Sequence, residues 1–131
     1  MTCFWDSLIH HIHTEDFNNL FNYASGLHPR PAEFITLLKN NNIKTSNILW
    51  NNELLSNQLL NENYEAISNL DINLINNGYL CSCCDPFLLL ICELFEVSIN
   101  HNYNGTNIIY FNTKKTKYTM NFNNNLTHFY I

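Results

Sequence analysis

Apolar residues recur at helical spacing near the start of the chain: Leu8, Ile9, Ile12, Phe17, Leu20 and Phe21. This pattern predicts a helix from Cys3 to about Tyr23. The segment Thr14-Glu15-Asp16 resembles an N-cap followed by an acidic first turn, so the pattern also allows a break at this point.

Prolines and asparagines divide the next part of the chain. Residues 25–31 contain Pro29 and Pro31, which disfavour helix in the residue before each of them, and so predict a loop. Pro31 suits the first position of a helix that reaches Lys39. Leucine and isoleucine positions in 45–63 predict one or two more helices.

The middle of the chain leads into a strongly apolar helix. Residues 64–75 fit no single pattern, and Asn76-Asn77-Gly78 is a turn signal. Asp85 and Pro86 have the character of an N-cap and a first helical residue, and they predict a buried helix to about Phe95.

After Phe95 the apolar period changes from helical to alternating. Val97, Ile99 and His101 alternate with polar residues, and Asn104-Gly105 is a dipeptide typical of a hairpin turn. Further strands are predicted at 107–111, 117–122 and 126–131. The chain therefore predicts an α+β fold, with an N-terminal helical half packed on a C-terminal antiparallel sheet.

Composition limits the classes of function. A chain of 131 residues with 46% hydrophobic residues predicts one globular domain, residues 1–131. The net charge of −5, with only six Lys and Arg residues, argues against nucleic acid as a partner. No apolar run is long enough to span a bilayer, and 87–92 is far too short.

The cysteines indicate a reducing compartment. Their number is five, which is odd, and three of them crowd into Cys81-Ser82-Cys83-Cys84. A framework of structural disulfides is therefore not expected. The chain also lacks a basic segment before an apolar stretch at its start, so no signal peptide is predicted.

Two residues at opposite ends of the chain carry the candidate chemistry. Cys3 lies at the predicted start of the first helix, where the positive end of the helix dipole favours a thiolate. His128 lies in the last predicted strand. A helix-borne cysteine and a strand-borne histidine can meet across a cleft as a thiolate–imidazolium pair. Taken singly, each residue is more commonly structural, as a buried thiol or a strand histidine.

The sequence resembles the ovarian-tumour (OTU) type of cysteine proteases. Cys3-Phe4-Trp5-Asp6-Ser7-Leu8 is similar to the nucleophile block of that family, and Thr127-His128-Phe129-Tyr130 is similar to its terminal histidine strand. The stretch Asn77-Gly78-Tyr79-Leu80, followed by the helix that begins at Pro86, resembles the glycine-aromatic loop and helix of the family. The compact size and asparagine-rich character resemble papain-like proteases of RNA-virus polyproteins, including those of nidoviruses such as toroviruses.

The resemblance implies a papain-like thiol protease with Cys3 and His128 as catalytic residues and with no cofactor or metal. It implies a viral hydrolase in the host cytoplasm that cleaves polyprotein junctions, ubiquitin or ubiquitin-like conjugates, or both. A nucleophile this near the start suggests a domain cut from a longer polyprotein, and we expect a monomer. Acidic side chains at Glu33, Asp85 or Glu93 are candidates to meet the arginines of a ubiquitin tail, and aromatic residues are candidates to line its channel: Trp5, Tyr79 and Phe129.

The sequence departs from the family pattern at the residue that orients the histidine. Tyr130 stands where an acidic residue commonly follows the histidine. The candidates that remain are Asn121, Asn123 and Asn124, a residue upstream of Met1, or no orienting residue at all.

Two other kinds of function stay open. A catalytically weak or inactive binding module of the same fold is the first. A small zinc-binding domain is the second, with Cys81, Cys83, Cys84, Cys92 and His101 as possible ligands, although their spacing is poor for a zinc site. The histidines His10, His11 and His13 also cluster, with His10 and His13 one helical turn apart, but a solvated helix face explains them more simply.

Overall fold

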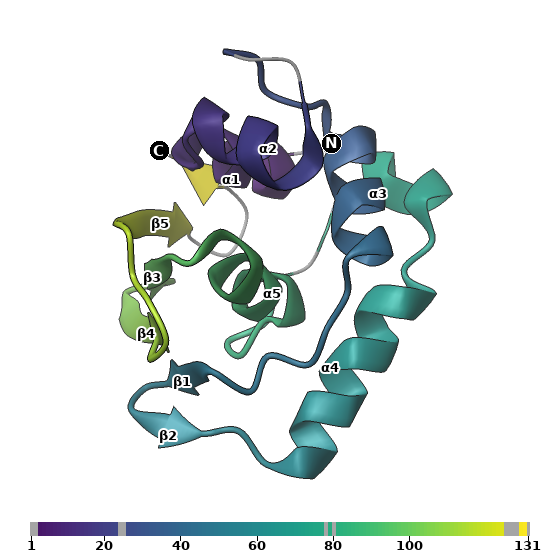
Figure 1. Ribbon diagram of the computed structural model, residues 1–131. Helices are drawn as coiled ribbons and strands as arrows, with labels where there is room; N and C mark the ends of the chain where they lie inside the picture. The colour runs from purple at the N-terminus through teal and green to yellow at the C-terminus, as the bar shows by residue number, and fades with distance from the viewer. Residues whose placement is uncertain (1–2, 24–25, 78, 80, 125–128, 131) are drawn as a thin grey trace.

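The computed structural model describes residues 3–23, 26–77, 79, 81–124 and 129–130. Helices cover one face of a mixed β-sheet, which makes the fold α+β (Figure 1). The helical elements are α1 (Cys3–His11), α2 (Thr14–Phe21), α3 (Pro31–Asn40), α4 (Asn57–Asn69), the 3-10 helix η1 (Ile72–Asn77) and α5 (Pro86–Phe95). The strands are β1 (Ile48–Trp50), β2 (Glu53–Leu54), β3 (Ser98–Tyr103), β4 (Thr106–Asn112), β5 (Thr119–Asn124) and β6 (Phe129–Tyr130).

The local signals in the sequence locate most helices correctly. The first helical segment is broken, because α1 ends at His11 and α2 begins at Thr14. The Asp85 carboxylate accepts hydrogen bonds from the backbone N–H groups of Phe87 (2.9 Å) and Leu88 (3.4 Å). This confirms Asp85 as the N-cap of α5.

The prediction of a wholly antiparallel sheet is wrong. The strand order is β2-β1-β4-β3-β5-β6, and β3 pairs with β5 in parallel. The chain leaves β4 and passes the start of β3 before it enters β5, instead of making a second hairpin. Two backbone bonds hold this crossover there: Lys117 N donates to Glu96 O (2.8 Å) and Ser98 N donates to Tyr118 O (3.2 Å).

The prediction of helix across 48–54 is also wrong. These residues form the β1–β2 hairpin, in which Leu49 lies opposite Leu54 and also opposite Phe111 of β4. Asn51 N donates to Ile109 O, and Asn51 Oδ1 accepts from Ile109 N, both at 2.8 Å. Pairing with β4 therefore overrides the helical spacing of the leucines, and α4 starts only after this hairpin.

The core lies around α5, between the sheet and the remaining helices. Seven of the ten residues of α5 are buried. On the sheet side it contacts β3 and β4, whose residues Ile99 and Tyr110 are completely buried. Helix α1 packs beside α5, on β5 and β6 (Figure 1). Among the helices of the described residues, none combines the length and the hydrophobicity needed to cross a bilayer.

Candidate active site

Helix α1 is fixed by the two aromatic residues that follow Cys3. Phe4 and Trp5 are 2% and 1% exposed. The Trp5 ring meets Phe4, Phe34 and Phe87 edge to face, with centroids 4.8, 6.5 and 4.9 Å away. Trp5 is therefore a core residue, and it does not line an open channel. Its burial holds the first turn of α1, which begins at Cys3, against the rest of the molecule.

The catalytic pair itself falls outside what the structure describes. The backbone of Cys3 opens α1, but its side chain and the whole of His128 lie outside the described residues. Cys3 and His128 as a catalytic pair therefore stay a prediction.

The segment that follows His128 in sequence lies against α1. Strand β6 pairs with the end of β5, with Tyr130 opposite Asn123 and Phe129 opposite Asn124. Both β5 and β6 contact α1. On β5, the Phe122 ring meets Phe4 edge to face, with centroids 5.7 Å apart. The helix that begins at Cys3 and the strand that begins after His128 are thus neighbours, although they come from opposite ends of the chain.

Tyr79 joins the first turn of α1 to the start of α5. Its ring lies 4.5 Å from that of Phe4 and 5.2 Å from that of Trp5, between centroids. Its hydroxyl donates to Asp85 Oδ2 at 2.9 Å. Because the ring is largely buried and the Asp85 carboxylate is close, the pKa of Tyr79 is raised far above its ordinary value. The sequence predicts Asp85 as an N-cap but gives no signal for this phenol bond, since no spacing rule connects a loop residue to a cap six positions later.

The Asp85 carboxylate is fully buried, and both of its oxygens accept hydrogen bonds. Besides Tyr79 it accepts hydrogen bonds from the backbone N–H groups of Ser82, Phe87 and Leu88. Burial raises the pKa of this carboxyl, and these four hydrogen bonds lower it in part. Asp85 is 0% exposed, so it is not available to meet an arginine of a substrate.

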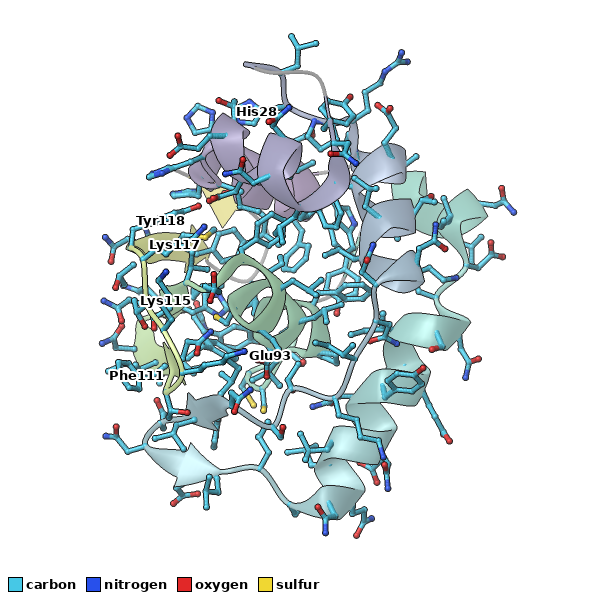
Figure 2. The ribbon with its side chains drawn as sticks, viewed as in Figure 1. His28, Glu93, Phe111, Lys115, Lys117 and Tyr118 are labelled. Carbon is cyan, nitrogen blue, oxygen red and sulfur yellow. The ribbon has the colours of Figure 1, made fainter. Side chains whose placement is uncertain are left out.

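The other two acidic candidates also have partners within the chain. Glu93 accepts from Asn47 N (3.1 Å) and from Asn47 Nδ2 (3.0 Å), which ties α5 to the start of β1 (Figure 2). Glu33 accepts from the backbone N–H of Arg30 at 3.0 Å and caps the start of α3. Both carboxylates therefore already contribute to the fold, and their role toward a ubiquitin tail stays a prediction.

The candidate orienting asparagines differ in position. Met120 and Phe122 of β5 are buried against the helices. Asn121 and Asn123 alternate with them and therefore occupy the opposite face of the sheet. Asn121 is exposed, and its Oδ1 accepts from Asn100 Nδ2 at 3.5 Å. The side chain of Asn124 lies outside the described residues, so the orienting residue is not assigned.

The described cysteines of the loop differ in burial. Cys81 is buried, Cys84 is half-buried and Cys83 is exposed. Burial, followed by the charges of Cys83 and Asp85, raises the pKa of the Cys84 thiol to about 11, and burial raises that of Cys81 further. Among the described residues, no group of three or more His, Cys, Asp and Glu side chains is placed to hold a metal ion.

The histidines near the end of α1 do not share one helix face. His13 follows the end of α1 and stacks on Tyr118, with ring centroids 3.8 Å apart. His10 lies instead near His28, 6.5 Å between centroids. The predicted one-turn spacing of His10 and His13 is wrong, because the helix ends between them.

A partly buried charge cluster, which the sequence does not reveal, holds α2 to the crossover before β5. The Asp16 carboxylate accepts from Lys117 Nζ and from Tyr118 Oη, each at 2.6 Å (Lys117 and Tyr118 are labelled in Figure 2). Tyr118 Oη also accepts from His13 N at 3.1 Å. Asp16 is 3% exposed, although the sequence suggests only an acidic first turn there. The partners are a hundred residues apart along the chain, so no local pattern signals them.

Comparison with protein-family models, curated proteins and solved structures finds no match to this chain.

Proposed function

We propose that this protein is a papain-like, OTU-like cysteine protease that hydrolyses peptide or isopeptide bonds. The observation that carries the proposal is the contact of α1, which begins at Cys3, with β6, which begins directly after His128. A thiol at a helix start and an imidazole from an adjacent strand are the two groups that this chemistry requires.

The proposed reaction uses these two groups in sequence. His128 takes the thiol proton, and the Cys3 thiolate attacks the carbonyl carbon of the scissile bond. The imidazolium then returns a proton to the leaving amine, which departs and leaves an acyl thioester on Cys3. Water, deprotonated by His128, attacks the thioester, and the bond to sulfur breaks to release the acid and restore the thiol.

The proposed substrate class follows from the family resemblance. One feature of the structure supports the proposed position of the nucleophile. Phe4, Trp5 and Tyr79 form a rigid aromatic group beneath the first turn of α1. Such a support fixes the nucleophile helix, as an enzyme that positions its thiolate requires. We propose viral polyprotein junctions, or ubiquitin and ubiquitin-like conjugates, as substrates in a reducing compartment.

A ubiquitin that carries a thiol-reactive group at its C-terminus tests this proposal. The parent protein is expected to form a covalent adduct, Cys3→Ala is expected to form none, and His128→Ala is expected to react far more slowly. The matched control is Cys83→Ala, because Cys83 is an exposed cysteine of the chain outside the proposed site. An adduct that survives Cys3→Ala but disappears in Cys83→Ala would contradict the proposal.

A binding module of the same fold is the second candidate. The observation in its favour is that Asn121, one possible orienting residue, is exposed and bonded to Asn100 on the far face of the sheet. Tight binding of ubiquitin without any adduct, in both the parent and Cys3→Ala, would select this alternative.

A further inference from the structure

The outer face of the sheet, which faces away from α5, carries a row of apolar side chains. Leu49 lies directly opposite Leu54 of β2 and directly opposite Phe111 of β4. Residues directly opposite in antiparallel strands project to the same face. Their neighbours Ile48 and Tyr110 project to the other face and are buried at 1% and 0% exposure. Leu54, Leu49 and Phe111 thus form a continuous row across three strands, which we call the apolar row.

The two ends of the apolar row are exposed to solvent, and Leu49 between them is half-buried. Leu54 is 80% exposed and Phe111 is 44% exposed. Figure 2 shows Phe111 on the outside of the sheet, on the side away from α5. Single exposed apolar residues are ordinary on protein surfaces, but three in register on adjacent strands form a contiguous patch, which is typical of an interaction site.

The positive charge of an otherwise acidic chain is concentrated next to this row. Lys114, Lys115 and Lys117 make up half of the six Lys and Arg residues. Lys117 is held by Asp16, whereas Lys114 and Lys115 are exposed. The backbone N–H groups of these two lysines donate to Asn112 Oδ1 (2.9 and 3.1 Å), so they follow Phe111 in a tight turn. Figure 2 shows Lys115 on the same side of the molecule as Phe111.

Most of the remaining outer face is covered by side-chain amides, which surround the half-buried Ile109 of β4. By the register of β3, β4 and β5, these amides share the face of Phe111: Asn100, Asn102, Asn107, Asn121 and Asn123. Transfer of amides into a lipid interior is costly, whereas the peptide groups of an extended chain can hydrogen-bond with them. This composition favours a polypeptide partner over a membrane surface.

We propose that the apolar row and the Lys114–Lys115 turn form a docking site for an extended, acidic segment of a partner protein. Apolar side chains at alternate positions of the segment pack on Leu54, Leu49 and Phe111, and carboxylates at one end meet Lys114 and Lys115. This site is separate from the proposed active site, and it does not depend on Cys3 or His128.

A fluorescein-labelled peptide of alternating valine and serine, with aspartates at one end, tests the proposal by fluorescence anisotropy. Binding by the full chain is expected to saturate and to weaken as salt is raised. Phe111→Thr and the double variant Lys114→Glu/Lys115→Glu are each expected to bind at least about tenfold more weakly, as for loss of a central contact. Leu54→Thr is a second variant, and because Leu54 is 80% exposed this substitution is not expected to affect folding.

Matched controls distinguish binding at this site from nonspecific binding. Leu27 is 57% exposed and lies between α2 and α3, so Leu27→Ser is expected to bind as the parent does. A peptide with lysines in place of the aspartates is expected not to bind. Three results would overturn the proposal: undiminished binding by Phe111→Thr and Leu54→Thr, capture by anionic lipid vesicles but not by the peptide, or a solution dimer that Phe111→Thr dissociates.

Discussion

Asparagine occupies left-handed backbone positions at which many proteins use glycine. Among the described residues, four asparagines have a positive φ, between 47° and 66°: Asn22, Asn51, Asn52 and Asn104. Asparagine tolerates this region better than other residues with a side chain. The abundance of asparagine and the scarcity of glycine, with only three in the chain, therefore have a structural consequence in the turns.

The turn between β1 and β2 allows a direct test of this point. Asn51 and Asn52 have φ of 47° and 66°, and the Asn104-Gly105 turn has 48° and 89°. Asn52→Gly is expected to raise the free energy of unfolding by up to about 1 kcal/mol, because glycine suits this turn without strain. Asn52→Val is expected to lower it by about 1–2 kcal/mol. Urea unfolding followed by circular dichroism measures both, and equal stability of the two variants would contradict the prediction.

The cysteines are expected to differ sharply in reactivity. In a Cys3→Ala background, iodoacetamide at pH 8 should modify the exposed Cys83 first, the half-buried Cys84 far more slowly, and the buried Cys81 and Cys92 only after denaturation. The thiolate is the reactive form and burial raises the pKa of Cys84 to about 11, so its alkylation rate should keep increasing with pH up to that value. Peptide mapping by mass spectrometry measures the sites, and fast labelling of Cys84 at neutral pH would contradict the prediction.

At the scale of elements, an ion pair between Asp16 and Lys117 connects the helical half to the sheet. Asp16 of α2 binds both Lys117 and Tyr118 just before β5. The Asp16 side chain is 4% exposed and that of Lys117 is 32% exposed, so water screens this pair incompletely. Such a pair fixes the relative position of two elements even where its net contribution to stability is small.

Removal of one partner of this pair should be costly. Asp16→Ala leaves Lys117 and the Tyr118 hydroxyl without their acceptor, and we expect a loss of about 1–3 kcal/mol in the free energy of unfolding. The control Glu15→Ala, at a side chain 77% exposed, should change stability by less than about 0.5 kcal/mol. A double-mutant cycle with Lys117→Met measures the coupling, and a coupling near zero would show that the two side chains act independently.

At the scale of the whole molecule, one apolar cluster joins both ends of the chain. Trp5 lies near the N-terminus and meets rings from α1, α3, α5 and the loop at Tyr79. Phe122 from β5 meets Phe4 and so connects the sheet to the same group. The contact of α1 with β5 is therefore part of the core.

The two tryptophans should respond very differently to substitution. Trp5→Ala is expected to lower the free energy of unfolding by about 3–5 kcal/mol, because it leaves a large cavity among aromatic rings. Trp50 is only partly buried, so Trp50→Phe, which removes the bond from Nε1 to Cys83 O (2.9 Å) and part of the ring's packing, should cost only about 1 kcal/mol. Chemical denaturation measures the free energy of unfolding of both variants. A small effect of Trp5→Ala would show that Trp5 does not hold α1 in place.

The sequence by itself determined the features that depend on neighbouring residues. It located the starts of α3 and α5, the break after α1, the Asn104-Gly105 hairpin and the α+β class, because caps, turns and apolar periods are local signals. It also supplied Cys3 and His128 as a candidate pair, which stays a prediction.

Only the tertiary structure decided which distant segments meet. The parallel pairing of β3 with β5, the pairing of β1 with β4 in place of a helix, and the burial of Asp16 against Lys117 and Tyr118 follow from long-range contacts. The apolar row has the same origin, since Leu49, Leu54 and Phe111 become neighbours only through strand register. A local pattern cannot reveal these features, because the free energy of each contact depends on residues far away in the chain.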